Sequence, residues 1–339
     1  MTDYFRPIPC LDPARSTEGY MLAGSWAWFD RVEVLSRTAP TRVMSAQDLP
    51  KAAFDRLVMP RPAIAGLSFD TPKLMGILNV TPDSFSDGGL HFQAEAALAG
   101  TRDMIAQGAD LIDVGGESTR PGAETVEADE EIRRTAPVIA AIRAEVDRPI
   151  SIDTRKECVA RAAHAAGADI VNDVAGFTFD PALAPFCAEA GLPVMVMHAQ
   201  GTPETMQKDP RYDHVALDVY DFLEERIAAL TALGLERTQI IVDPGIGFGK
   251  TLEHNLTLLR NLSLFHGLGC PILLGASRKR FIGTLGGSEQ ARHRAPGSIG
   301  VALAGLAQGV QMLRIHDVGP TREAIALWWA ATYGSPLEI

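Results

Sequence analysis

Short apolar runs alternate with longer amphipathic runs from about residue 73 onward, and this alternation limits the possible folds more than any other feature. Each short run is almost continuously apolar, as expected for a parallel strand that is covered on both faces. The longer runs have the spacing of amphipathic helices. The runs that qualify as strands comprise residues 73–79, 110–114, 149–153, 169–173, 193–198, 239–243, 271–275 and 310–316.

The regularity of this repeat favours a closed barrel. Strand ends recur about every 34 residues between Asn79 and His316, which suits one strand–helix unit. Helical patterns cover 94–107, 129–146, 156–166, 215–233 and 252–264. Several stop at a glycine, which tolerates the left-handed conformation that ends a helix; these are Gly108, Gly167, Gly191, Gly234 and Gly309. We therefore predict an α/β fold, a TIM (β/α)8 barrel. A doubly wound open sheet is the alternative, although such sheets usually have fewer strands.

Residues 1–60 break the pattern. They contain scattered Pro and Arg and the WAWFD segment near Trp26, without strand–helix alternation. We predict an N-terminal extension over 1–60 that packs on the barrel or on an oligomer partner. The barrel domain is then predicted over 61–339. The sequence assigns no function to the extension.

Composition excludes several classes of protein. The net charge of -11 argues against a general binder of nucleic acid or membrane surfaces, because both need positive surface. No run approaches the ~18 apolar residues of a membrane span. The N-terminus lacks a basic and then apolar signal, so the cytoplasm is the expected compartment. The cysteines have no CxxC spacing and are expected as free thiols; they are Cys10, Cys158, Cys187 and Cys270.

Polar residues gather where the predicted strands end, and barrels of this kind build their active sites from the loops at those ends. The polar strand ends are Asn79, Asp113, Asp153, Asn172, Asp173, His198, Asp243, Arg314 and His316. A single strand-end Asp is often only a helix cap. So many polar ends at one mouth predict a site.

Three kinds of ligand fit these residues. Arg314 and His316 are two apart on a strand and face the same way, so with Arg120 and Lys279 they suit a diphosphate. A salt bridge inside the barrel is the other interpretation of Arg314.

Asp153, Asn172 and Asp243 can bind the hydrogen-bonding edge of a flat, nitrogen-rich ring such as a 2-amino-4-oxo pterin. A structural turn is the other interpretation of Asp243. Asn79 is a plausible single oxygen ligand for Mg²⁺, which often keeps few protein ligands.

One motif is misleading. GIGFGKT at residues 245–251 looks like a phosphate loop, but the first glycine of that pattern would have to be Pro244. The GxGxxG pattern also fails, because its third glycine falls on Lys250.

Ordered motifs at the strand ends resemble the dihydropteroate synthase family over about residues 65–335. They are GILNVTPDSFSDGG (76–89), DVGGESTRPGA (113–123), SIDTRK (151–156), VND (171–173), DPGIGFGK (243–250), GASRKRF (275–281) and LRIHDV (313–318). The resemblance implies a transferase of folate biosynthesis with Mg²⁺ as cofactor. Such an enzyme condenses (7,8-dihydropterin-6-yl)methyl diphosphate with 4-aminobenzoate to 7,8-dihydropteroate and diphosphate.

The resemblance also implies a role for each residue that matches a family motif. The pterin would be bound by Asp153, Asn172, Asp243 and Lys279. The diphosphate would be held by Asn79, Arg314 and His316, with Asn79 also on Mg²⁺. The 4-aminobenzoate pocket, where sulfonamides would compete, would be framed by Phe85, Thr119, Arg120, Pro121, Phe248 and Ser277. Catalysis would depend on Asp153, Asp243, Lys279, Arg314 and His316. A homodimer is also expected from the resemblance.

Three other functions could use some of the same residues. A pterin-binding methyltransferase domain shares the pterin residues but has no need of Arg314, His316 or the STRPG segment. A Schiff-base aldolase could use Lys279, whose neighbours Arg278 and Arg280 could lower its pKa. A non-catalytic barrel would bind the pterin without turnover.

Overall fold

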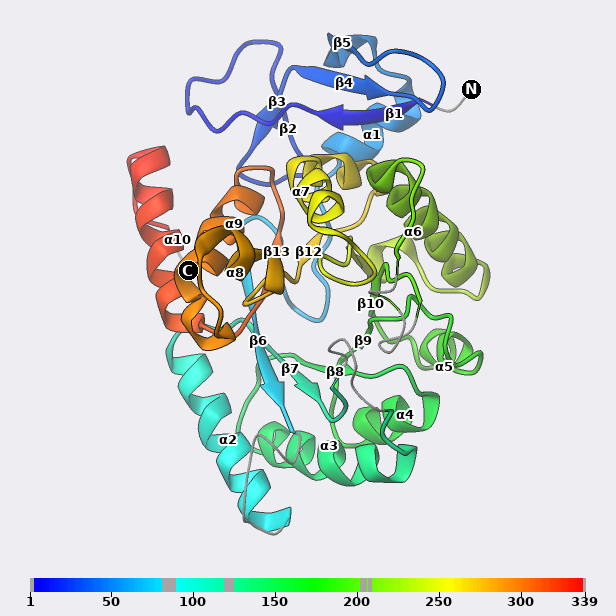
Figure 1. The fold of residues 1–339 in the computed structure, drawn as a ribbon, viewed down its shortest axis with the longest axis vertical. Coiled ribbons are helices and arrows are strands. Elements are labelled where there is room, and N and C mark those ends of the chain that lie inside the picture. The colour runs from blue at the N-terminus through cyan, green and yellow to red at the C-terminus, as the bar shows by residue number, and fades with distance from the viewer. Residues whose placement is uncertain (1–2, 81–89, 119–124, 202–205, 207–208, 338–339) are drawn as a thin grey trace.

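A closed parallel barrel forms the body of the molecule (Figure 1). The computed structural model describes residues 3–80, 90–118, 125–201, 206 and 209–337. The barrel strands are β6 (Lys73–Asn79), β7 (Leu111–Gly115), β8 (Ile150–Asp153), β9 (Ile170–Asp173), β10 (Val194–Met197), β11 (Ile240–Asp243), β12 (Leu273–Leu274) and β13 (Met312–Ile315). They pair in the order β11-β10-β9-β8-β7-β6-β13-β12, and a parallel bridge between Val242 and Ile272 joins the two ends. The predicted TIM barrel is confirmed.

Helices surround this barrel between its strands. They are α2 (Leu90–Ala106), α3 (Ala128–Arg143), α4 (Glu157–Ala165), α5 (Leu183–Ala190), α6 (Val215–Ala232), α7 (Leu252–Arg260), α8 (Arg280–Gly286), α9 (Ala295–Leu306) and α10 (Val318–Tyr333). The predicted helix-ending glycines all have positive φ, namely Gly108, Gly167, Gly191, Gly234 and Gly309. Their lack of a Cβ makes this conformation accessible, so the sequence signal and the structure agree.

The α7 segment differs from the prediction of one helix over 252–264. The helix ends at Arg260, and a 3₁₀ helix, η4 (Leu262–Leu268), follows it. Asn261 causes the change, because its Nδ2 donates to the Thr257 carbonyl at 2.8 Å. Its backbone N–H donates to the Leu258 carbonyl at 3.0 Å instead. The side chain thus takes the acceptor that the next turn of an α-helix would need.

The barrel interior is stratified, because alternate residues of each strand point inward. One apolar layer near the amino ends of the strands consists of Met75, Leu111, Ile170, Met195, Ile241, Leu273 and Met312. Ile64, Leu67 and Phe69, which precede β6, pack against this layer. They therefore cover the apolar layer at the amino ends of the strands.

The N-terminal extension contains small antiparallel sheets and one helix. Its elements are β1 (Tyr4–Pro7), β2 (Tyr20–Met21), β3 (Trp28–Phe29), β4 (Arg31–Leu35), β5 (Arg42–Ser45), η1 (Ala46–Asp48) and α1 (Lys51–Val58). The sheet order is β1-β4-β5, and β2 pairs with β3. The predicted lack of strand–helix alternation in this segment is therefore confirmed.

The extension packs on the barrel through both apolar and polar contacts. Ser263 in η4 donates to the Pro7 carbonyl at 2.8 Å, and the Trp26 indole donates to the Leu306 carbonyl at 3.0 Å. Because η4 and the end of α9 lead into β12 and β13, the extension lies away from the strand carboxyl ends (Figure 1). The predicted boundary between the extension (1–60) and the barrel domain (61–339) stays a prediction.

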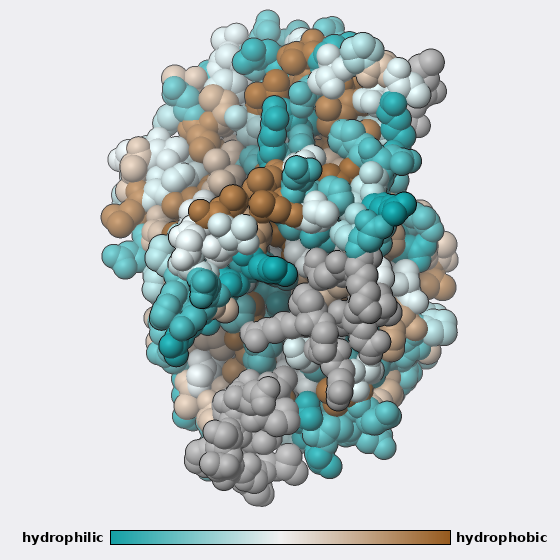
Figure 2. Space-filling view, viewed as in Figure 1, coloured by the Kyte–Doolittle hydropathy of each residue, from teal (hydrophilic) through white to brown (hydrophobic). Residues whose placement is uncertain are grey.

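Hydrophobic side chains are visible on the extension and in a band just below it (Figure 2). Val43 and Met59 are large apolar residues of the extension that are exposed. Among the helices of the described residues, none is long and apolar enough to cross a membrane. All four cysteines are free thiols, as predicted.

Candidate active site

A polar layer lies directly above the apolar layer inside the barrel. It contains Asp113, Asn172, Asp243 and Arg314. On its own strand, each of them lies two residues after a member of the apolar layer. Since inward-facing residues alternate, these side chains point toward the barrel axis. Asp153 at the end of β8 joins them through Arg314. The structure thus brings together the predicted ring-binding residues and the predicted anion-binding arginine.

The Arg314 guanidinium bridges two carboxylates. Its Nε donates to Oδ2 of Asp113 at 2.7 Å, and one terminal nitrogen donates to Oδ2 of Asp153 at 2.8 Å. Burial lowers the pKa of Arg314, but Asp113 and Asp153 outweigh burial and raise it above the ordinary value. Arg314 therefore stays charged and forms the interior salt bridge that was its second interpretation.

The environment of Asp153 disfavours the charged form of its carboxyl group. Burial raises its pKa, while Arg314 lowers it and Asp113 raises it further. Its Oδ1 is buried and has no hydrogen-bond partner among the described residues. An unpaired buried carboxylate oxygen costs free energy, so a ligand that donates an N–H here would be stabilised.

Asp113 organises the layer, although the sequence indicated only that it ends a strand. Its side chain is fully buried and accepts from Oγ of Ser151 at 2.6 Å. Nδ2 of Asn172 also lies 3.3 Å from both of its oxygens. Asp113 therefore orients Asn172 and Arg314 together. Its sequence signals were its place among the polar strand ends and its position two residues after Leu111, which puts both side chains on the same face of the strand.

Asp243 and Lys279 form the opposite side of the site. Oδ1 of Asp243 accepts from the backbone N–H of Gly245 at 2.7 Å, and burial raises the pKa of this carboxyl group against the opposing charge of Lys279. The Lys279 ammonium lies 3.8 Å from the centre of the Phe248 ring, a cation–π contact. Lys279, which is predicted to bind the pterin, therefore contacts Phe248, which is predicted to frame the 4-aminobenzoate pocket.

Ser277 and His316 are paired. Oγ of Ser277 lies 3.0 Å from Nδ1 of His316 and accepts from its backbone N–H at 3.2 Å. Ser277 therefore fixes the ring of a residue predicted to hold diphosphate. Arg278, next to Ser277, is ion-paired with Asp317.

Asn79 lies close to Asp153 at the mouth. A Cβ placed on Gly115 would lie 3.8 Å from Oδ1 of Asn79 and 3.8 Å from Oδ2 of Asp153, so both oxygens line the same small space above Gly115. Amide and carboxylate oxygens suit Mg²⁺. Among the described residues, no group of three His, Cys, Asp or Glu side chains could hold a metal. The donors therefore fit an ion that takes most of its ligands from substrate and water.

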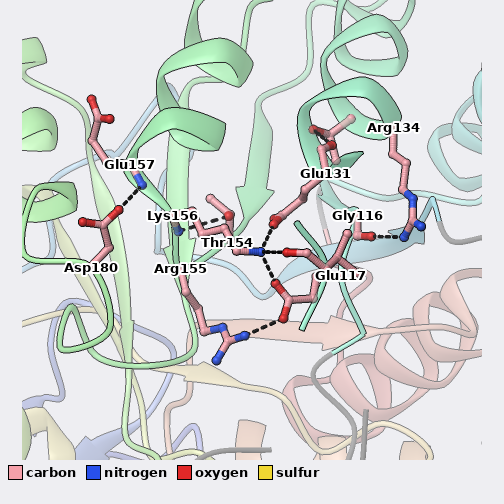
Figure 3. Close-up of polar contacts among 11 residues, drawn as sticks. Gly116, Glu117, Glu131, Arg134, Thr154, Arg155, Lys156, Glu157 and Asp180 are labelled. Atoms are coloured by element: carbon pink, nitrogen blue, oxygen red, sulfur yellow. Dashed lines mark hydrogen bonds and ion pairs between the residues drawn. The ribbon is translucent and has the colours of Figure 1, made fainter. Parts of the chain in front are cut away.

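A buried charge network lies beside this site (Figure 3). The Lys156 ammonium donates to Glu117 and Glu131, each at 2.5 Å, and to the Val126 carbonyl at 2.7 Å. Arg155 donates to the other oxygen of Glu117 at 2.5 Å. Lys156 thus joins the end of β8 to α3 and to residues on either side of 119–124. Sequence reasoning assigned no role to these residues.

Four predicted pocket residues, Phe85, Thr119, Arg120 and Pro121, lie outside the described residues. The remaining predicted site residues all lie at or next to the carboxyl ends of the barrel strands. They share one mouth, although their individual roles stay predictions.

Comparison with known proteins supports the same interpretation. Residues 75–316 match the family described as pterin binding enzyme. The dihydropteroate synthase of Neisseria meningitidis serogroup B is 45% identical over 269 residues, which are 78% of this chain and 94% of that protein. The Escherichia coli K12 dihydropteroate synthase is 45% identical over 262 residues, 76% of this chain and 91% of its own.

Solved structures agree. Xanthomonas albilineans dihydropteroate synthase with 4-aminobenzoic acid is 45% identical, covers 79% of this chain and 97% of its own, and has a TM-score of 0.75. The same enzyme with 7,8-dihydropteroate is 42% identical, with coverages of 79% and 96% and a TM-score of 0.72. Yersinia pestis dihydropteroate synthase in a sulfonamide complex is 42% identical, with coverages of 80% and 98% and a TM-score of 0.75.

Proposed function

The chain belongs to the dihydropteroate synthases of the pterin-binding family, and from this premise we propose how its residues carry out the reaction. The enzyme condenses (7,8-dihydropterin-6-yl)methyl diphosphate with 4-aminobenzoate in folate biosynthesis. A C–N bond forms between the pterin methylene and the aniline nitrogen. The C–O bond to diphosphate breaks, and the nitrogen loses one proton, so the products are 7,8-dihydropteroate and diphosphate.

One observation supports this reaction best: Arg314 donates hydrogen bonds to both Asp113 and Asp153 within the polar layer of the barrel. We assign the N–H groups of the pterin edge to Asp153 and Asp243, with Asn172 between them. The Oδ1 atom of Asp153, which lacks a partner among the described residues, suits one such donor. Both carboxylates also stabilise the positive charge that develops on the methylene as diphosphate leaves.

The diphosphate is assigned to Arg314, His316 and Asn79. Arg314 remains charged between its two carboxylates, and Ser277 holds the imidazole of His316 in one orientation. Mg²⁺, which Asn79 would hold, supplies charge neutralisation for the leaving diphosphate. The three side chains lie around one mouth, so they can reach successive oxygens of a single ligand.

The 4-aminobenzoate pocket is assigned to Phe248 and Ser277 with Phe85, Thr119, Arg120 and Pro121. Phe248 offers a ring face beside Lys279, which suits a flat aromatic substrate. Sulfonamides share the shape of 4-aminobenzoate, and the protein of Yersinia pestis has been solved in a sulfonamide complex. Competition with 4-aminobenzoate is therefore expected here.

A steady-state assay tests these assignments. Purified protein with Mg²⁺, the pterin diphosphate and 4-aminobenzoate should form dihydropteroate, and a sulfonamide should raise the KM for 4-aminobenzoate. Arg314→Ala should lower kcat/KM by about 100-fold or more, the size found when a charge-stabilising donor is removed. Full activity in this variant would contradict the diphosphate assignment, whereas absence of product from the unaltered enzyme would contradict the function.

Two broader proposals accompany the reaction. We propose a homodimer, and Leu252 and Leu256, one turn apart and exposed on α7, are apolar residues that such a contact could cover. Light scattering would measure the mass. We also propose a cytoplasmic location, which the four free thiols support because disulfides are rare in that compartment. Cell fractionation would test it.

A further inference from the structure

Lys250, the lysine of the sequence that imitates a phosphate loop, lies inside the protein. Its relative exposure is 3%. Its ammonium contacts Nδ1 of His198 at 2.9 Å, the His198 carbonyl at 3.3 Å and the Phe248 carbonyl at 2.9 Å. An ammonium has three N–H donors, and these acceptors use all of them. Among the described residues, the hydrogen-bond partners of this buried cation therefore include no carboxylate.

These acceptors belong to two different segments at the strand ends. His198 directly follows β10, and its backbone N–H donates to the Asp243 carbonyl at 3.0 Å. Phe248 lies in the turn between β11 and α7. A Cβ on Gly245 would lie 1.9 Å from the His198 carbonyl oxygen, so the backbone of this turn approaches the residue that follows β10 very closely. Lys250 therefore fastens the turn to β10.

The contact requires a neutral His198. Nδ1 can accept from Lys250 only when the ring proton is on the other nitrogen. Burial, and then the charge of Lys250, lower the pKa of His198 far below its ordinary value, so the ring stays neutral. Burial also lowers the pKa of Lys250 to about 7, while Asp243 opposes this shift. The geometry is consistent with a cation that Asp243 helps to retain.

We propose that Lys250 is a positioning residue of the pterin subsite. By holding the turn over residues 244–249, it keeps two pterin-binding groups in place. The turn supplies the Gly245 N–H that anchors Asp243 at 2.7 Å, and it places the Phe248 ring 3.8 Å below the Lys279 ammonium. This inference rests on the proposed roles of Asp243 and Lys279, and Lys250 itself acts through them rather than on the substrate.

Calorimetric binding of the pterin diphosphate, without 4-aminobenzoate, tests the proposal. Lys250→Ala should weaken this binding about tenfold, the effect of losing one hydrogen bond to a charged group. Lys250→Met keeps most of the side-chain volume and should show a similar loss, so a cavity is not the cause. Tyr212→Phe removes a neutral 2.7 Å hydrogen bond to Gly249 in the same turn and should have a smaller effect.

Chemical rescue separates the cation from its volume. n-Propylamine replaces the atoms that Lys250→Ala lacks, so it should restore pterin binding at neutral pH. n-Propanol has a similar size without the charge and should not restore it. Equal rescue by both compounds, or unchanged pterin affinity in both Lys250 variants, would overturn the proposal. Turnover by the unaltered enzyme is measured first, so failure of the proposed function is recognised separately.

Discussion

Nε of Arg314 donates a 2.7 Å hydrogen bond to Oδ2 of Asp113, a carboxylate whose side chain has no exposed surface. The same carboxylate accepts from Ser151 and Asn172. Asp113 thus orients an anion-binding residue and a ring-binding residue, although it need not touch either substrate. It is a positioning group whose loss should affect both subsites.

Asp113→Asn is expected to destabilise the protein and to impair catalysis. The amide cannot neutralise Arg314, and its NH₂ group would face the guanidinium or Asn172. Removing one partner of a buried ion pair costs about 3 kcal/mol. Urea unfolding should therefore show a lower midpoint, and kcat/KM should fall by at least about 100-fold. Ser151→Ala is the control, because it removes a neutral donor and should cost about 1 kcal/mol. A fully stable and active Asp113→Asn enzyme would refute this role.

Pterin binding should weaken in mild acid. The raised pKa of Asp153, caused mainly by burial, means that protonation begins well above the ordinary aspartate value of about 4. A protonated Asp153 accepts fewer N–H bonds, so the KM for the pterin should rise as pH falls below neutrality. Steady-state assays between pH 5 and pH 8 measure this. Asp153→Asn should bind pterin poorly at every pH; if it keeps the pH dependence of the unaltered enzyme, another group is responsible.

Periodicity predicted the barrel well, because each strand and helix has its own hydrophobic signature. It also predicted that Arg314 and His316 face the same way, because they are two residues apart on a strand. Periodicity could not predict which side chains Arg314 contacts. Arg314 and Asp113 are 201 residues apart, and no local pattern specifies which strand ends meet.

Short elements were also beyond sequence reasoning. Strands of two to five residues in the extension depend on remote pairing, such as Tyr4 with Leu35. The end of α7 depends on a single side-chain hydrogen bond from Asn261. A regular pattern predicts neither feature, because each depends on a few specific atoms rather than on periodic burial.

Removal of residues 1–60 should destabilise the barrel. The extension covers η4 and the end of α9, and Trp26 packs on Trp329 at 5.9 Å between ring centroids. Exposure of this surface should lower the thermal midpoint by about 5 °C or more. Calorimetry of the truncated and full chains measures the difference. Identical midpoints would show that residues 1–60 do not stabilise the barrel.

His266 should make the protein less stable in acid. Burial, assisted by Arg61, lowers its pKa to about 3. Below about pH 6.5, His266 therefore binds a proton in the unfolded chain but not in the folded protein. Its contribution to the free energy of unfolding is fully present above that pH and is lost as pH falls. The loss between pH 7 and pH 5 is about 2 kcal/mol. His266→Gln should remove this loss in urea unfolding, whereas the exposed His293→Gln should not; an unchanged slope in His266→Gln would contradict the assignment.

Replacement of Lys156 in the buried charge network is expected to destabilise the protein. Lys156→Met leaves the carboxylates of Glu117 and Glu131 buried without their shared cation. Such a loss costs about 3–5 kcal/mol, and urea unfolding measures it. Adding Glu131→Gln removes one of the stranded charges and should recover part of the loss. Lys51→Met is the matched control, since that lysine is 88% exposed and pairs with Asp55 on the surface, where the cost is below about 1 kcal/mol. Equal costs for the two lysines would show that the network contributes no more than a surface ion pair.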